Sequence, residues 1–201
     1  PCVRSMQIDY DDEVEYKGAQ CLYDLARAPQ GKPFFLTVSY THPHPPFVAP
    51  QKHWDMYRRE DIDAPRVPPI PYEELDEHSQ WLYVAHAQDI YSVSDEQVLN
   101  ARHAYYGMVS FLDDNIGKVL LALQESGLAD STRVIYSTDH GDNLGNRHMW
   151  GKSVHYEEAC AIPMIIAGPG IGAGRVCDTP VSLVDIYPTI LQSVGLAPDS
   201  L

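Results

Sequence analysis

The chain has 201 residues, of which 28 are acidic and 14 basic, so its formal net charge is −14. This length supports one domain with a full core, and we expect residues 1–201 to form part of a single domain. The acidic excess argues against nucleic acid or an anionic membrane as a partner, and no apolar run of about 18 residues predicts a membrane span.

The start of the chain and its cysteines bear on cellular context. The chain begins Pro1-Cys2 without a methionine, and no basic-then-apolar stretch resembles a signal peptide. We therefore expect a fragment of a longer protein, and missing targeting signals say nothing about the intact protein. The four cysteines have neither C-x-x-C spacing nor a dense framework, which favours a reducing compartment.

The first predicted elements are a helix and a strand. Apolar residues recur at helical spacing between residues 11 and 28, before a Pro-Gln-Gly sequence. Residues 33–40 form a nearly continuous apolar and aromatic run, which predicts a strand buried on both faces. The following loop carries His42 and His44, and its three prolines forbid a helix or a central strand.

The middle of the chain contains an irregular segment and a long helix. Residues 48–93 have no sustained period and contain closely spaced prolines, which predicts a long excursion that covers one end of the sheet. Residues 94–97 resemble a capping box, an apolar stripe runs through residues 105–123, and Gly127 predicts the end of this helix.

The last third of the chain alternates between strands and helices. We predict strands at residues 132–137 and 163–167, a short helix after Lys152, a Gly-rich turn at 168–174 and a last helix at 184–194. This alternation predicts an α/β fold with a mainly parallel sheet and helices on both faces.

Asp139 and His140 follow the strand at residues 132–137, and Gly141 permits a sharp turn. Ligands collect at the carboxyl ends of strands in open α/β sheets, so the pair predicts a metal site. A carboxylate and a neutral imidazole suit calcium, magnesium, manganese or zinc, but two ligands are too few for any of them. A polar turn in which Asp139 is only a cap remains the alternative.

Parallel strands would bring His44 and Lys152 to the same end of the sheet as Asp139 and His140. A cation, an imidazole and an ammonium group around one cavity suit a tetrahedral oxyanion. Either His44 or Lys152 could protonate a leaving alkoxide, which indicates hydrolysis of a sulfate or phosphate ester. The alternatives are a surface position for Lys152 and a packing role for His44.

Several neighbouring residues are weaker candidates for the predicted site. Asp142 could orient the His140 ring without binding the metal itself, whereas Trp150 is more typical of a packing residue. No spacing ties His148 or His155 to a metal. The sequence contains neither a G-x-S-x-G elbow nor a phosphate-cradling glycine loop, so no nucleophile is evident.

Several motifs, in a fixed order, resemble the sulfatases of the alkaline phosphatase superfamily. Residues 139–145, with Trp150-Gly-Lys152, are similar to the second metal-ligand segment and sulfate-contacting lysine of that family. Residues 181–189 are similar to a later family signature. The segments that resemble choline-sulfatases in particular are residues 9–13, 34–47, 61–65 and 104–110.

The resemblance implies a partial alkaline-phosphatase-like sulfatase domain. It implies that Asp139 and His140 bind one divalent cation, with calcium first and manganese or magnesium as alternatives. It implies that Lys152 contacts the sulfate and that His44 assists the leaving group. Residues 2–5 lack the C-x-[P/A]-S-x-R pattern of the family, so a formylglycine nucleophile and further metal ligands are expected upstream.

The function implied is hydrolysis of choline sulfate to choline and sulfate, although this chain alone should not turn over substrate. Residues 153–157 are less typical of choline-sulfatases, which leaves the alcohol half of the substrate open. The alternatives are a phosphonate monoester or phosphodiester hydrolase and a non-catalytic metal-binding protein of the same fold. We expect a small-molecule sulfate ester as the partner, a cytoplasmic location and a homo-oligomer in the intact enzyme.

Overall fold

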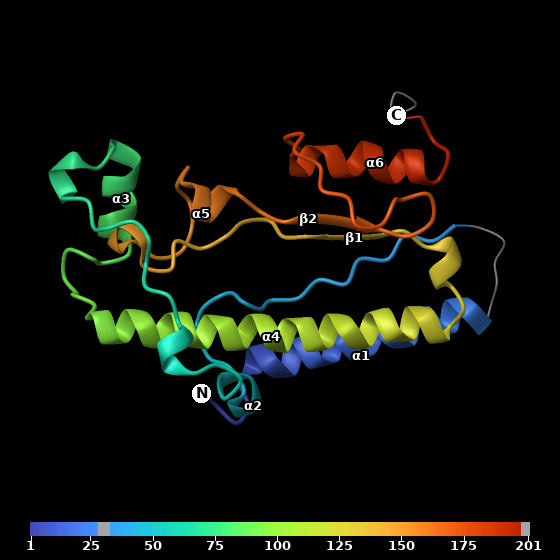
Figure 1. The fold of residues 1–201 in the computed structure, drawn as a ribbon, viewed down its shortest axis with the longest axis horizontal. Helices are drawn as coiled ribbons and strands as arrows, with labels where there is room; N and C mark the ends of the chain where they lie inside the picture. The colour runs from blue at the N-terminus through green and yellow to red at the C-terminus, as the bar shows by residue number, and fades with distance from the viewer. Residues whose placement is uncertain (28–32, 198–201) are drawn as a thin grey trace.

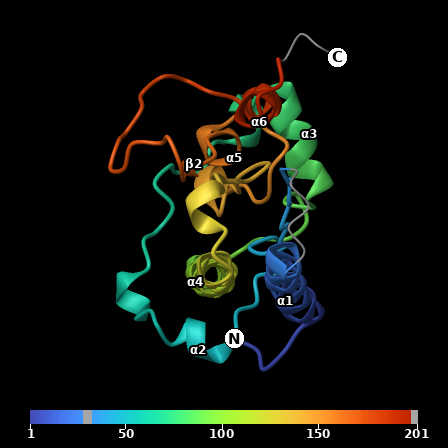
Figure 2. The ribbon, with the colours of Figure 1, turned by 90° about the vertical axis from the view of Figure 1, so that its right-hand side faces the viewer.

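The computed structural model describes residues 1–27 and 33–197. Two long helices, α1 (Met6–Arg27) and α4 (Asp95–Glu125), lie side by side along one edge of the molecule (Figures 1 and 2). No helix in these residues is long and apolar enough to cross a bilayer.

The limits of α4 follow from its sequence. The Ser94 side chain accepts a hydrogen bond from the backbone of Gln97, and the Gln97 side chain accepts one from the backbone of Ser94. This capping box satisfies backbone donors that the first turn leaves without partners. Gly127 follows the helix with a φ of 73°, which a glycine adopts readily. The predicted helix and both of its end signals are confirmed.

Helix α1 begins earlier than predicted. The Ser5 side chain accepts a hydrogen bond from the backbone of Ile8, which starts the helix at Met6 rather than at residue 11. The described helix ends at Arg27, and the predicted last residue, Ala28, lies outside the described residues.

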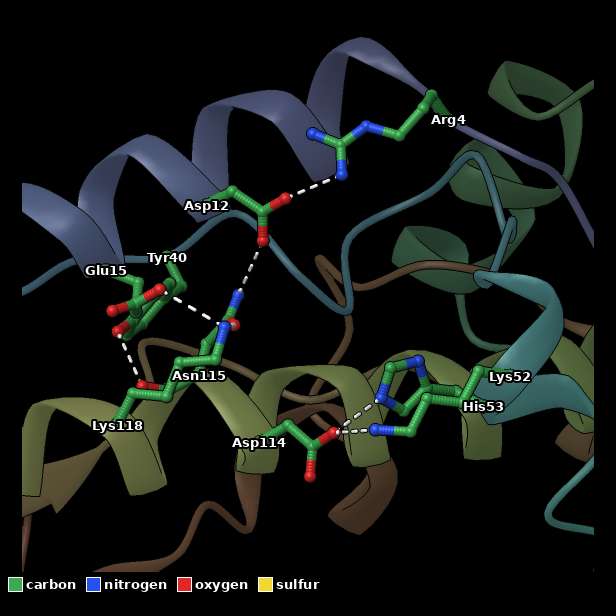
Figure 3. Close-up of polar contacts among 9 residues, drawn as sticks. All are labelled: Arg4, Asp12, Glu15, Tyr40, Lys52, His53, Asp114, Asn115 and Lys118. Atoms are coloured by element: carbon green, nitrogen blue, oxygen red, sulfur yellow. Dashed lines mark hydrogen bonds and ion pairs between the residues drawn. The ribbon is translucent and has the colours of Figure 1, made fainter. Parts of the chain in front are cut away.

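Polar side chains join α1 to the second half of α4 (Figure 3). Asn115 donates to Asp12 over 3.5 Å, and Lys118 donates to Glu15 over 3.2 Å. Because residue numbers rise together along the two helices, α1 and α4 run in the same direction.

A sheet of two strands, β1 (Val134–Ser137) and β2 (Met164–Ala167), lies above the two long helices in Figure 1. Helix α6 (Ile186–Ser193) lies on the far side of this sheet in both views (Figures 1 and 2), so helices flank both faces. Val134 pairs with Ala167 and Ser137 with Met164, so the two strands are antiparallel. The mainly parallel pairing that we predicted is therefore not found between the strands that the structure describes.

The prediction of a strand at residues 33–40 is wrong for the described residues. The segment is extended between α4 and β1 (Figure 1), but no hydrogen-bonded ladder includes it. Phe34 and Leu36 pack against a core cluster formed by Leu22, Ala122 and Leu123. Phe35, which points the other way, is 69% exposed, so the segment is buried on one face only.

Residues 48–93 include two α-helices that we did not predict, α2 (Gln51–Trp54) and α3 (Glu77–Ala85). Asp76 caps α3 by accepting a hydrogen bond from the backbone of Ser79 over 3.0 Å. The remaining short elements are η1 (Arg59–Asp61), η2 (Tyr72–Glu74), η3 (Ala129–Ser131), η4 (Asn146–His148), α5 (Glu157–Cys160) and η5 (Leu183–Asp185).

Candidate active site

The structure brings His44 and Lys152 into direct contact. Lys152 Nζ lies 2.8 Å from His44 Nε2, although the two residues are 108 positions apart in the chain. His44 Nδ1 lies 2.9 Å from the carbonyl oxygen of Pro45, so Nδ1 carries the proton of the neutral ring. His44 Nε2 is then the acceptor and the Lys152 ammonium is the donor.

The loop that carries His44 is anchored by a buried carboxylate. Asp11, on α1, accepts hydrogen bonds from Thr41 N over 2.8 Å, from Thr41 Oγ1 over 3.0 Å and from His42 N over 2.9 Å. His42 Nδ1 lies 2.6 Å from the same carboxylate, and both side chains are fully buried. His42 is therefore a structural residue that fixes the loop, whereas His44 faces the site.

The pKa of Asp11 reflects this anchoring. Burial opposes ionisation and acts to raise the pKa, but the hydrogen bonds from His42 and Thr41 together outweigh burial. The pKa of Asp11 is therefore held below its ordinary value, and the loop is attached to a carboxylate anion.

Asp139 and His140 follow β1, where the chain turns back toward α5. The Gly141 N–H donates to the carbonyl oxygen of Ala159 over 2.9 Å. This hydrogen bond attaches the turn to α5. His140 Nδ1 lies 2.8 Å from the carbonyl oxygen of Gly141, which leaves Nε2 unprotonated in the neutral ring. This arrangement presents His140 Nε2 as a ligand and fixes the orientation of the ring.

The donor chemistry of this pair fits a divalent cation. Asp139 Oδ2 and His140 Nε2 are 3.5 Å apart, and the Asp139 side chain is 80% exposed. One ion with bonds of about 2.0–2.4 Å could contact both atoms. In the described part of the chain, no group of three or more His, Cys, Asp or Glu side chains could hold a metal ion. An ion held here would therefore need donors from elsewhere.

His140 also lies next to the His44 and Lys152 pair. The ring centroids of His44 and His140 are 6.5 Å apart, with the rings inclined at 65°. The four residues singled out from the sequence thus gather at one place, although the strands are not parallel.

Asp142 does not orient His140 in the way we expected. Asp142 Oδ1 accepts hydrogen bonds from Leu144 N over 2.9 Å and from Gly151 N over 3.1 Å. The neighbouring Asn143 is fully buried, and its backbone N–H and its side-chain Nδ2 both donate to the Gly151 carbonyl oxygen over 2.8 Å. Both polar groups of Gly151, the residue before Lys152, are therefore held by Asp142 and Asn143.

A cavity of about 410 Å³ opens beside His44 and Lys152. Its walls include Phe47, Trp150 and His86, together with Asp142. The Phe47 and Trp150 ring centroids are 6.1 Å apart. Trp150, which the sequence suggested was a packing residue, therefore also borders this cavity.

Tyr105 packs against Phe47, one of the residues that line the cavity. Its ring packs edge-on against Phe47, with centroids 5.9 Å apart. Burial, followed by the nearby Asp142 carboxylate, raises the pKa of Tyr105 to about 12. Tyr105 therefore remains a neutral phenol across the physiological range.

Sequence reasoning missed His86 and Asn143. His86 lies in the irregular segment and no motif points to it, whereas Asn143 is inside the Asp-His-Gly-Asp-Asn sequence and adjacent to the predicted ligands. The position of Asn143 in that motif was the only feature of the sequence that pointed to a role for it at the site.

Comparisons with known proteins identify the family of this chain. The sulfatase family model matches residues 5–196. A choline-sulfatase from Rhizobium meliloti (strain 1021) is 38% identical over 194 residues, which cover 95% of this chain and 38% of that protein. An arylsulfatase from Clostridium perfringens (strain 13 / Type A) is 33% identical over 182 residues, which cover 88% of this chain and 37% of that protein.

A solved structure shows the same fold. A phosphonate monoester hydrolase from Silicibacter pomeroyi matches with a TM-score of 0.73 and 33% identity over 88% of this chain and 38% of that chain. The chain thus spans less than two-fifths of the length of each of these relatives. The described residues form part of an α/β, alkaline-phosphatase-like sulfatase fold, and the chain belongs to the sulfatase family.

Proposed function

We propose that the protein carrying this sequence hydrolyses sulfate esters and that choline sulfate is its substrate. The observation that carries the proposal is the contact between Lys152 Nζ and His44 Nε2, beside His140. The similarity to a choline-sulfatase supports the choice of alcohol.

Lys152 and His44 would act on the oxygens of the ester. The Lys152 ammonium would donate hydrogen bonds to a sulfate oxygen and stabilise charge that develops there. The proton that now lies between Lys152 Nζ and His44 Nε2 would pass to the leaving alkoxide, because both atoms face the same space.

Asp139 and His140 would hold the divalent cation, which we propose is calcium, with manganese or magnesium as alternatives. Such an ion would polarise a sulfate oxygen, and a formylglycine from another part of the protein would supply the nucleophile. The remaining metal donors would also come from outside the described residues.

A second candidate is hydrolysis of a phosphonate monoester or phosphodiester. The 33% identical phosphonate monoester hydrolase favours it, and the four site residues suit either tetrahedral oxyanion. The third candidate is a non-catalytic metal-binding protein of the same fold. A C-x-[P/A]-S-x-R sequence elsewhere in the full protein would support either enzyme, and its absence would support the non-catalytic reading.

The deciding experiment compares choline sulfate and a phosphonate monoester as substrates of the full-length protein. The enzyme is first chelated, and calcium, manganese or magnesium is then added back singly. We expect calcium to restore activity and the specificity constant for choline sulfate to be the higher. A higher value for the phosphonate would move the assignment to the second candidate, and no metal-dependent activity on either would contradict both.

We further propose that the intact enzyme is a cytoplasmic homo-oligomer that acts on a small-molecule ester and binds neither nucleic acid nor membrane. The net charge of −14 supports the last point, because anionic surfaces would repel such a protein.

A further inference from the structure

We infer that the cavity beside His44 and Lys152 receives the alcohol half of the ester and that His86 determines which alcohols it accepts. The inference rests on the sulfatase activity proposed above. It assigns a role in substrate selection to the segment of residues 48–93, which carries His86.

Helix α3 is fixed to the segment that carries Lys152. His78 Nε2 lies 2.6 Å from the carbonyl oxygen of Ser153, so the imidazole donates to that backbone group. Ser79 Oγ lies 3.1 Å from the hydroxyl of Tyr156, and Leu82 packs on a cluster formed by Met149, Val154 and Ala159. These contacts span about one turn of α3 and fix the helix relative to the segment that carries Lys152.

The C-terminal end of α3 places His86 at the cavity. The His86 backbone N–H caps the helix by donating to the Leu82 carbonyl oxygen over 2.9 Å. The ring lies close to Gly151, where an added Cβ would be 3.1 Å from His86 Cε1. Among the described residues, no hydrogen bond holds the His86 ring, so the ring is free to lie against a ligand in the cavity.

The other walls indicate the chemical class of the alcohol. Phe47 and Trp150 present aromatic rings inclined at 44°, and the Asp142 carboxylate also borders the space. Aromatic faces near a carboxylate suit a compact cationic group such as a quaternary ammonium. A volume of about 410 Å³ is near the small end of ligand cavities, which favours a small alcohol over a sugar chain.

The test uses the full-length protein with His86→Ala and His86→Phe. His155→Ala is the matched control, because His155 lies near α3, with its ring centroid 6.0 Å from that of His78, but does not border the cavity. The specificity constants for choline sulfate and 4-nitrophenyl sulfate are measured, together with inhibition by free choline. Thermal unfolding of each variant verifies folding.

We expect His86→Ala to lower the preference for choline sulfate over the aryl ester by about tenfold or more and to weaken inhibition by choline. His86→Phe, which keeps an aromatic face for the ammonium group, should recover part of the preference, and His155→Ala should remain within about twofold of wild type. Equal losses on both esters with unchanged choline inhibition would overturn the inference while the proposed function stood. A wild-type enzyme without activity on either ester would overturn both.

Discussion

At the residue scale, the Lys152 ammonium donates a hydrogen bond to the His44 ring, which also lies beside the His140 ring. We predict that His44→Ala or Lys152→Ala in the full-length enzyme lowers kcat by at least about a hundredfold, as removal of a general acid or a charge stabiliser does. Steady-state kinetics on choline sulfate would measure the loss.

Two exposed residues serve as controls for these variants. Lys17→Ala removes a surface lysine paired with Glu13 one turn away, and His155→Ala removes a histidine outside the cavity. Both controls should retain the wild-type rate. Activity of His44→Ala or Lys152→Ala within about threefold of wild type would remove that residue from the proposed site.

Asp11 gives a prediction about pH. Its pKa is lower in the folded protein than in the unfolded chain, so the unfolded chain binds the proton more tightly. The stabilisation is fully present above the ordinary carboxyl pKa of about 3.9 and is lost as pH falls through the lower folded value. Asp11→Asn should remove this acid dependence and cost about 3 kcal/mol near neutral pH, because the buried donors lose their anion.

Denaturant unfolding between neutral and acid pH would measure the effect of Asp11→Asn. Asp24→Asn, which removes an exposed acid near the other end of α1, should leave the free energy of unfolding almost unchanged. An Asp11→Asn variant as stable as wild type would show that the carboxylate does not anchor the loop of His42.

The sequence singled out the four residues that the structure brings together, but it did not identify the residues that support them. His44, Asp139, His140 and Lys152 could be found because each follows a strand-like run or lies in a recognisable motif. Asp11 could not, because its partners, Thr41 and His42, lie 30 and 31 positions away and no local pattern records such a contact.

At the element scale, the turn at Gly141 depends on the absence of a side chain. A Cβ at this position would overlap the carbonyl oxygen of Glu158, which belongs to α5. We predict that Gly141→Ala destabilises the protein by about 1–3 kcal/mol and reduces activity, because it separates α5 from the turn that carries His140.

Gly117 provides the matched substitution for Gly141. It lies within α4 with no atom within 4 Å of an added Cβ. Gly117→Ala should stabilise the helix by up to about 1 kcal/mol and leave activity unchanged. Thermal unfolding of both variants measures the difference, and a stable, active Gly141→Ala would contradict the role assigned to the turn.

Local signals determined which elements could be predicted. Capping residues and a glycine stop defined α4, and β-branched runs defined β1 and β2. The extended segment at residues 33–40 was predicted as a paired strand, since composition reports extended conformation but pairing requires a neighbouring strand. Helix α3 was missed because its largest apolar side chain, Trp81, is 64% exposed, so no apolar stripe marks the helix.

At the scale of the whole molecule, large apolar side chains lie exposed on separate elements. Phe35 is 69% exposed, Ile165 of β2 is 58% exposed and Val184 of η5 is 77% exposed. The chain spans 38% of the choline-sulfatase that it resembles. That residues 1–201 form part of a single catalytic domain stays a prediction.

We predict that residues 1–201 produced alone self-associate and do not hydrolyse choline sulfate, whereas the full-length protein is active and monodisperse. Exposed apolar surface drives the association, and the nucleophile is expected outside this sequence. Size-exclusion chromatography with light scattering, alongside the same kinetic assay, would compare the two. A monodisperse and active 201-residue chain would contradict this view.

The hydrogen bonds that Asp142 and Asn143 make with Gly151 would affect the energetics of the proposed reaction. With its N–H and its carbonyl both bonded, Gly151 has both flanking peptide planes restrained, and the second of these planes includes the backbone nitrogen of Lys152. The entropy of ordering the backbone at Lys152 is therefore lost during folding, and the proposed reaction would not have to order it at each turnover. In the proposed reaction, little rearrangement of this backbone would accompany charge development in the ester.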